Sequence, residues 1–167
     1  STTVMLAMGD ALSVCLLKVK KFKEEDFAFY HPGGSLGRRL LLKVEDIMRK
    51  GAANPIVREN KLVKDVLYAI TKARAGAASV VNKKGKLVGI FTDGDLRRHL
   101  DSGSNLPTLK IKEVMTKGPV TVKKDQLAAE ALRILEEKRI DEVPVVDKLH
   151  RPVGMLDVQD LLKAGLV

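Results

Sequence analysis

Two stretches of this 167-residue chain repeat one another at a nearly constant spacing, and this repeat strongly restricts the folds that are possible. The matching segments lie 65 residues apart: Val80-Val81 and Val145-Val146, Gly89-Ile90-Phe91 and Gly154-Met155-Leu156, and Asp95-Leu96 and Asp160-Leu161. Ahead of each copy, a short segment ends in a methionine, at Met48 and at Met115. A fixed internal period indicates a fold that is built from two copies of one unit.

Each copy shows the same order of expected elements. Copy one predicts strands at 56–57, 78–81 and 87–91, and copy two predicts strands at 120–122, 143–146 and 152–156. After the first strand of each copy, apolar residues recur at the spacing of an amphipathic helix. They are Leu62, Val66, Leu67 and Ile70 in copy one, and Leu127, Ala131, Leu132 and Leu135 in copy two. Turns at 82–85 and 147–150 and closing helices at 95–100 and 158–164 complete two β-α-β-β-α units.

Two such units cannot each bury a sheet face alone, so we expect them to pack against each other with pseudo-two-fold symmetry. The pattern over residues 44–167 resembles the tandem pair of cystathionine-β-synthase-type (CBS) domains. The fold class is therefore predicted as α/β (α+β), with CBS repeat one at 44–105 and CBS repeat two at 106–167.

The resemblance implies a small ligand, usually a nucleotide, in the cleft between the repeats. In CBS pairs a threonine or serine after the last strand and an aspartate three residues later contact ribose and phosphate, and Thr92 and Asp95 match them. Asp160 matches the aspartate in copy two, so these three are the candidate ligand-binding residues. The residues alone also fit simple helix caps. Because copy two carries Asp157 in place of the threonine, and an anion repels phosphate, we expect one intact half-site.

The first part of the chain is apolar almost all round from Val4 to Val19, with Asp10 inside it. This run is shorter than the roughly 20 apolar residues that a membrane-spanning helix needs, and it lacks the charge pattern of a signal peptide. We therefore expect a helix that belongs to a larger domain, is buried on most sides and is capped by the hydroxyls of residues 1–3.

A glycine-rich run follows, FYHPGGSLGRR at residues 29–39, and its glycines predict a tight turn. Together with the apolar start and the CBS pair, this run resembles the carboxy-terminal half of the arabinose-5-phosphate isomerases. In that family a sugar isomerase (SIS) domain precedes the CBS pair, so residues 1–43 are expected to be the end of an SIS domain. The resemblance implies aldose-ketose interconversion of ribulose 5-phosphate and arabinose 5-phosphate for Kdo synthesis, with His31 as the catalytic acid or base. Without the resemblance, a structural histidine before Pro32 explains His31 better.

Charge and composition narrow the possible partners. The formal net charge of +9 fits an anionic ligand, whereas 4% aromatic residues, no tryptophan and no recognition motif make nucleic-acid binding the weakest hypothesis. The single cysteine, Cys15, excludes a disulfide within the chain and fits a reducing, cytoplasmic location. Basic residues that could offset a ligand's phosphate charge are Lys112, Lys117, Arg97, Arg98 and Arg139.

Two functions stay open on these grounds. One is a regulatory module that binds a nucleotide or CMP-sugar and controls an isomerase whose substrate is a sugar phosphate. The other is a structural module that builds a homo-oligomer, a dimer or a tetramer, without a ligand. We expect no cofactor, no metal site, no nucleic acid and no membrane partner, and we expect His99 and His150 to be exposed. Because the family's phosphate-binding loop lies upstream, the chain by itself is expected to be inactive.

Overall fold

The computed structural model describes residues 1–30, 34, 37, 40–100 and 105–166. These residues form two compact units, Ser1–Leu42 and Lys43–Val167.

In the first unit, α1 (Thr2–Val19) is followed by the short α2 (Glu24–Tyr30). No residue of α1 is buried by the rest of the described chain, so its burial in a larger domain stays a prediction. Its N-cap, Ser1, makes no side-chain capping hydrogen bond, so the expected cap from this hydroxyl is wrong. With a mean hydropathy of 1.5 over 18 residues, α1 is the one helix among the described residues that is long and apolar enough to cross a membrane. The core helix of a larger domain passes the same test.

The second unit contains two sheets. The first has the order β1-β2-β3-β4, with β1 parallel to β2 and the other neighbours antiparallel. The second has the order β5-β6-β7, again with a parallel first pair and an antiparallel second pair. The strands are β1 (Ile56–Arg58), β2 (Ala77–Val81), β3 (Leu87–Thr92), β4 (Thr116–Lys117), β5 (Val122–Lys123), β6 (Glu142–Val146) and β7 (Pro152–Asp157). The two copies of one unit that the sequence repeat predicts are thus confirmed.

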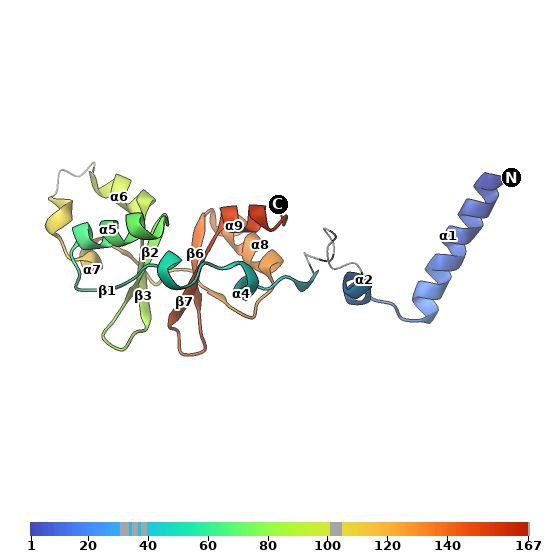
Figure 1. Cartoon of the computed structure of the whole chain (residues 1–167), viewed down its shortest axis with the longest axis horizontal. Helices are drawn as coiled ribbons and strands as arrows, with labels where there is room; N and C mark the ends of the chain where they lie inside the picture. The colour runs from blue at the N-terminus through green and yellow to red at the C-terminus, as the bar shows by residue number, and fades with distance from the viewer. Residues whose placement is uncertain (31–33, 35–36, 38–39, 101–104, 167) are drawn as a thin grey trace. The chain divides into compact units, whose positions relative to one another are not determined.

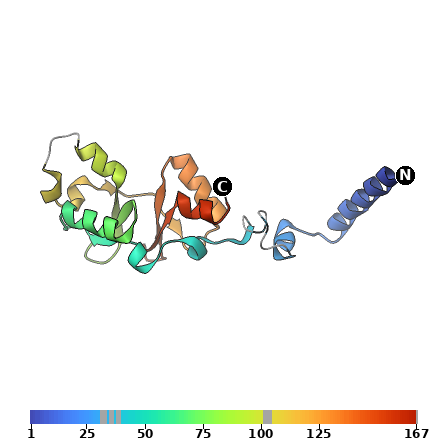
Figure 2. The same ribbon diagram turned by 45° about the horizontal axis from the view of Figure 1, so that its top comes forward.

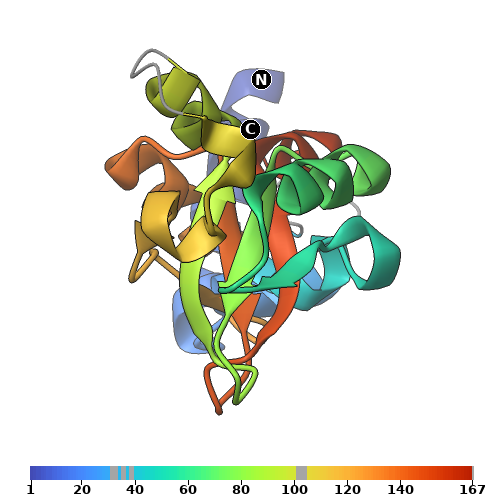
Figure 3. The same ribbon diagram turned by 90° about the vertical axis from the view of Figure 1, so that its left-hand side faces the viewer.

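The helices repeat in the same way, and the second unit shows two similar halves (Figure 1). They are α4 (Val44–Ile47), α5 (Val63–Ala73), α6 (Asp93–Leu100), α7 (Ile111–Val114), α8 (Ala128–Lys138) and α9 (Val158–Lys163), with short 3-10 turns η1 (Gly51–Ala53) and η2 (Leu106–Thr108). In each half a long helix connects the parallel strands and a shorter helix follows the hairpin (Figure 2). The long helices α5 and α8 both end in a left-handed arginine, Arg74 and Arg139, with φ of 52°. The two hairpins lie side by side (Figure 3), where Leu87 N donates to His150 O at 2.9 Å.

The first residues of each repeat pack on the opposite repeat. We call residues 43–49 and 110–116 the lead segments. β4, which begins at the end of the second lead segment, extends the sheet of repeat one beside β3. In the other direction, α4 of the first lead segment contacts α8 and β7 of repeat two. There Arg49 and Met155 exchange backbone hydrogen bonds of 2.8 and 3.1 Å. Each repeat is therefore completed by the lead segment of the other.

The repeated glycines make room for this exchange. A Cβ atom on Gly154 would lie 2.5 Å from Met48 Sδ and 3.0 Å from the carbonyl oxygen of Arg49. A Cβ atom on Gly89 would overlap Met115 Sδ in the same way. The recurring glycine and the recurring methionine of the sequence are therefore the two sides of one packing contact, made once in each direction.

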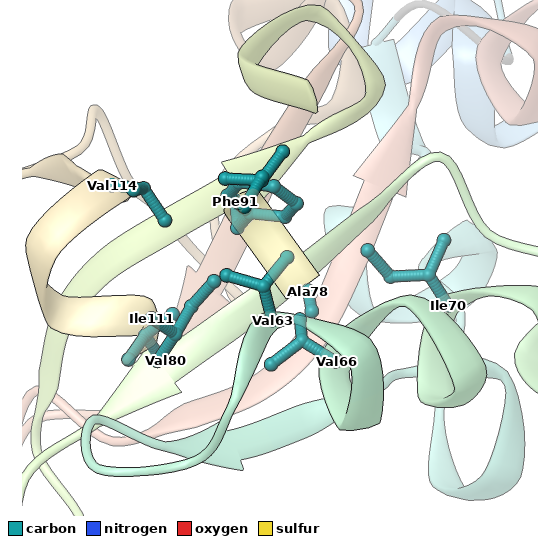
Figure 4. Close-up of a cluster of buried hydrophobic side chains, with 9 residues drawn as sticks. Val63, Val66, Ile70, Ala78, Val80, Phe91, Ile111 and Val114 are labelled. Atoms are coloured by element: carbon teal, nitrogen blue, oxygen red, sulfur yellow. The ribbon is translucent and has the colours of Figure 1, made fainter. Parts of the chain in front are cut away.

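The core of repeat one depends on the second lead segment (Figure 4). Side chains of α5, β2 and β3 meet those of α7, which belongs to that lead segment. The buried members are Val63, Val66, Ile70, Ala78, Val80, Phe91, Leu106, Ile111 and Val114. A separate buried cluster of Ala77, Ile90 and Met155 joins the two repeats.

Candidate ligand-binding cleft

A cleft of about 1000 Å³ lies in the second unit and is lined by both repeats. Its charged lining residues are Arg49, Arg74, Asp93, Asp95, Arg97, Arg98, Arg139, Asp141, Glu142 and Asp157. Apolar and small residues complete the lining, among them Gly76, Ile90, Thr92, Thr116, Pro119, Val120 and Pro144. Arginines and carboxylates occur in equal number, so the wall is strongly polar with no excess of either sign. A cleft of this size can hold a small organic ligand.

Thr92 and Asp95, two of the predicted ligand-binding residues, lie together in the cleft wall and cap α6. Asp95 N donates to Thr92 Oγ1 at 3.2 Å. In return, Asp95 Oδ2 accepts from Thr92 N at 2.9 Å and from Thr92 Oγ1 at 3.0 Å. This reciprocal pattern is a capping box. The two residues therefore cap a helix and face the cleft at the same time.

The carboxylate of Asp95 is fully occupied. The residue is 4% exposed, and its Oδ1 accepts from Thr116 Oγ1 at 3.0 Å and from the Arg98 guanidinium at 2.5 Å. A carboxylate offers about four acceptor positions, and the two bonds from Thr92 take the rest. The Arg98 side chain is 69% exposed. Of these partners, Arg98 is the one that a ligand could replace most easily.

Asp160, the third predicted ligand-binding residue, is not among the residues that line the cleft. Its carboxylate accepts from Arg49 Nε at 2.8 Å and from Arg49 Nη2 at 3.3 Å. Arg49 Nη2 also donates to Asp157 Oδ2 at 2.7 Å. These three side chains are 12–17% exposed. The guanidinium of Arg49 thus occupies the space between the two carboxylates of the second half-site.

The charge of Arg49 is secure. Burial lowers the pKa of Arg49, but the hydrogen bond to Asp160 and the charges of Asp157, Asp160 and Glu142 outweigh burial and raise the pKa. Asp157 also caps α9, because its Oδ1 accepts from Gln159 N at 2.8 Å. The charge of Asp157, which the sequence analysis expected to repel a phosphate, is therefore balanced by Arg49, a residue that the sequence analysis did not assign to the site.

Arg49 and Thr116 occupy equivalent positions in the two halves. Each directly follows the methionine of its lead segment and reaches the aspartate of the opposite repeat. Thr116 meets Asp95 through a neutral hydroxyl, whereas Arg49 meets Asp160 through a guanidinium. At this position the half-site at Asp95 therefore has a neutral hydroxyl, whereas the half-site at Asp160 has a guanidinium that forms an ion pair within the chain.

Glu142 is a cleft residue that the sequence analysis missed. It begins β6, lies opposite Asp157 in the sheet register, and accepts a 2.9 Å hydrogen bond from Gly76 N of repeat one. Burial, together with the charges of Asp157 and Asp93, raises the pKa of Glu142 to about 7, although the Gly76 hydrogen bond and the charge of Arg49 act in the opposite direction. The cleft thus contains a carboxyl group that titrates near neutral pH.

Some of the predicted basic residues line the cleft and others do not. Arg97, Arg98 and Arg139 line the cleft, whereas Lys112 and Lys117 are exposed and are not among its lining residues. His31 lies outside the described residues.

His150 is exposed as expected, but His99 is half-buried and its Nε2 lies 3.2 Å from Val114 O, so the expectation for His99 is wrong. Cys15 is a free, exposed thiol. Among the described residues no group of three histidines, cysteines or carboxylates is placed to hold a metal ion.

The CBS domain family matches the chain at residues 44–102 and at residues 111–167. The chain belongs to the CBS domain family. Its CBS pair is 28% identical to a solved structure, the CBS domain pair of protein MJ0100 in complex with 5′-methylthioadenosine and S-adenosyl-L-methionine. The similarity covers 72% of this chain and 93% of that chain, with a TM-score of 0.65.

The match extends beyond the CBS pair. Arabinose 5-phosphate isomerase KdsD of Pseudomonas aeruginosa is 50% identical over all 167 residues, and KdsD of Escherichia coli strain K12 is 46% identical over the same length. The chain covers 51% of each of these relatives, so it spans about half of their length. The resemblance to the arabinose-5-phosphate isomerases is thereby confirmed.

Proposed function

We propose that this chain is the regulatory CBS region of an arabinose-5-phosphate isomerase and that its cleft binds one nucleotide-type ligand. The observation that carries the proposal is the difference between the half-sites: Thr92 and Asp95 line the cleft and their charged partner Arg98 is 69% exposed, whereas the side chain of Arg49, which holds Asp160, is 17% exposed. The similarity to KdsD supports the parent enzyme, and the adenosine-containing ligands of the MJ0100 pair support the ligand class.

The occupied carboxylate of Asp95 suggests how such a ligand binds. A ribose hydroxyl takes the acceptor position on Oδ1 that the exposed Arg98 now holds, and Thr92 Oγ1 offers a second contact. The released Arg98 then pairs with the phosphate, together with Arg97 of the same helix. One ligand per pair is expected, because the equivalent position at Asp160 already holds Arg49.

The ligand is tested by thermal-shift titration of the chain with AMP, ATP, S-adenosylmethionine, CMP and CMP-Kdo. A ligand at about 100 times its Kd stabilises a protein by roughly 2.7 kcal/mol, which raises Tm by about 5–10 °C for a chain of this size. A response to the cytidine compounds indicates feedback by the product of the pathway, and a response to adenine nucleotides alone indicates an energy signal.

Thr92→Val is expected to weaken the binding of the responding nucleotide about tenfold, because a methyl group replaces the hydroxyl that faces the cleft. The measurement is isothermal titration calorimetry. Thr71→Val is the matched control, since Thr71 is exposed on α5 and is not a lining residue. Equal affinities of Thr92→Val and wild type would contradict the placement of the ligand at this half-site.

A structural module without a ligand is the second candidate. It is favoured by hydrogen bonds within the chain, in which Thr92, Thr116 and Arg98 satisfy Asp95 and Arg49 satisfies Asp160. On this alternative none of the five compounds shifts Tm, and the chain forms the expected dimer or tetramer in light scattering.

The parent enzyme's activity is tested separately. We propose that residues 1–43 belong to an SIS domain, that His31 is its acid or base, and that the protein is cytoplasmic. The purified chain is expected to produce no arabinose 5-phosphate from ribulose 5-phosphate, because it spans 51% of the length of KdsD. KdsD of Pseudomonas aeruginosa at full length serves as the positive control. Turnover by the chain itself would show that residues 1–167 suffice for catalysis.

A further inference from the structure

The two hairpin turns of the second unit lie side by side (Figure 3). The first turn, residues 82–86, joins β2 to β3, and the second turn, residues 147–151, joins β6 to β7. The hydrogen bond from Leu87 N to His150 O ties them together. β1 and β5 end at the same place, because Arg58 pairs with Val81 and Lys123 pairs with Val146. Loops of both repeats therefore form one continuous surface.

Both repeats place cations at the same positions of this surface. Three pairs of positions, 65 residues apart, carry a cation in each copy: Arg58 and Lys123, Lys83 and Lys148, and Lys86 and Arg151. Lys84 adds a seventh cation at the position that Leu149 occupies in the second copy. All seven residues are exposed. We call these seven cations and Leu149 the hairpin end.

The fold does not depend on these cations. The turns are held by Asn82 and Asp147, whose Oδ1 atoms each accept backbone hydrogen bonds of 2.8–3.1 Å from the residues two and four positions later. Within the described part of the chain, none of the seven cations forms an ion pair. Their side chains are therefore available to a partner.

The charge at the hairpin end is strongly one-sided. Carboxylates on the same loops number three, Glu59, Asp125 and Asp147, against seven cations. Cations gathered on one surface repel one another and attract anions from solution. A second copy of the chain does not fit as the partner, because it carries the same cations and a net charge of +9. The partner must therefore be anionic.

The residue types favour a lipid surface among the possible anions. Five of the seven cations are lysines, which are depleted at protein interfaces and act as mobile point charges, whereas arginine is preferred for paired hydrogen bonds. The turns at 82–86 and 147–151 contain no aromatic side chain on which a nucleic-acid base could stack. Lysines of this kind suit the diffuse charge of anionic headgroups.

Leu149 supplies the apolar contact that a lipid surface requires. It is 57% exposed in the second turn, and Lys148, His150 and Arg151 flank it. Binding to a membrane interface increases with the apolar area that enters the acyl boundary and with attraction to anionic lipids. Leu149 and the cations around it provide both.

We propose that the hairpin end binds an anionic lipid surface, with Leu149 inserted between the lipids and the seven cations at the headgroups. This partner differs from the sequence-based expectation of no membrane partner. It also goes beyond the proposed function and is independent of the nucleotide, because no residue of the hairpin end lines the cleft.

The first test is co-sedimentation of the chain with vesicles made from equal parts of phosphatidylcholine and phosphatidylglycerol. Vesicles of phosphatidylcholine alone are the control, since α1 is apolar enough to enter either kind. Binding to the anionic vesicles is expected to be at least roughly tenfold stronger. It is expected to weaken between about 0.1 and 1 M salt, because the Debye length falls from about 10 to about 3 Å. Equal binding to both vesicles would overturn the proposal.

The position of the contact is tested with Lys83→Ala, Lys148→Ala, which removes one equivalent lysine from each turn. A cation near an anionic surface strengthens binding about fivefold, so the double variant is expected to bind anionic vesicles roughly twentyfold more weakly. The control, Lys72→Ala, Lys138→Ala, removes the same charge from the last turns of α5 and α8, which lead into the opposite ends of β2 and β6. Equal losses in the two double variants would contradict docking through the hairpin end.

Insertion is tested with Leu149→Trp, because the chain has no tryptophan and the variant therefore carries a single reporter. Its fluorescence is expected to shift to shorter wavelength with anionic vesicles and to stay unchanged with neutral ones. Binding without this shift would overturn the insertion of Leu149. Duplex DNA and polyglutamate replace the vesicles in a parallel assay, and tighter binding of either at about 0.15 M salt would overturn the choice of lipid.

Failure of this proposal can be told apart from failure of the proposed function. The thermal shift with nucleotides is expected to be the same in wild type and in Lys83→Ala, Lys148→Ala. A chain that responds to nucleotides and ignores anionic vesicles would refute the lipid surface alone.

Discussion

Arg49→Ala is expected to lower the free energy of unfolding by about 3–5 kcal/mol, because removal of one partner leaves buried charges without compensation. Arg49 forms ion pairs with both Asp157 and Asp160, and all three side chains are 12–17% exposed. Without the guanidinium, two carboxylates face each other in a largely buried site. The loss corresponds to a fall in Tm of roughly 10 °C for a chain of this size.

Differential scanning calorimetry measures this loss of stability. Two further variants serve as a control and as a rescue. Arg133→Ala removes an arginine whose ion pair with Glu137 is exposed, so its effect is expected to stay below about 0.5 kcal/mol. The double variant Arg49→Thr, Asp157→Thr copies the arrangement of repeat one, in which Thr116 and Thr92 surround Asp95. We expect the double variant to recover a large part of the lost stability. A loss in Arg49→Ala no larger than in Arg133→Ala would contradict the closed half-site.

Gly154→Ala is expected to destabilise the chain by about 1–3 kcal/mol through overpacking. The added Cβ would lie 2.5 Å from Met48 Sδ, which can move, and 3.0 Å from the carbonyl oxygen of Arg49, which cannot move freely. That carbonyl accepts from Met155 N at 3.1 Å, so displacement of the lead segment breaks a backbone hydrogen bond. Urea unfolding at equilibrium measures the loss.

The position of the clash can be checked with a second substitution. Met48→Ala removes the sulfur that the new Cβ meets, so the double variant Gly154→Ala, Met48→Ala is expected to be more stable than the sum of the single losses predicts. Gly94→Ala is the control within the same unit, because its Cβ meets atoms at 3.4 and 3.5 Å, an ordinary contact distance. Additive losses would place the strain at Arg49 rather than at Met48.

Helices and strands in which apolar residues recur at a regular spacing could be predicted from the sequence. The hydrophobic spacing of Leu62, Val66 and Ile70 describes α5, and the expected strands at 78–81 and 87–91 differ from β2 and β3 by one residue at an end. β5 shares only Val122 with the expected strand at 120–122. β4 was not predicted, because a strand of two residues has no periodicity and pairs with the opposite repeat.

The candidate site was predicted in part. The family resemblance pointed to Thr92 and Asp95, and the structure places both in the cleft wall. Arg49 and Glu142 were missed because they lie outside the repeated motif. Both differ from their counterparts in the other copy, Thr116 and Ala77. A comparison of the copies position by position would have identified them, although their contacts require the exchange of the lead segments.

The exchange of lead segments also has a consequence for the order in which the chain can fold during synthesis. α4, near the start of the second unit, packs on β7, near its end, so α4 cannot reach its final packing until β7 has been synthesised. At 5–20 residues per second, the ribosome needs on the order of ten seconds to make the intervening chain. Contacts of such long sequence separation also slow folding in general. The first lead segment, and the apolar surface of Ala77 and Ile90 that meets Met155, therefore stay uncovered until the second repeat has emerged from the ribosome.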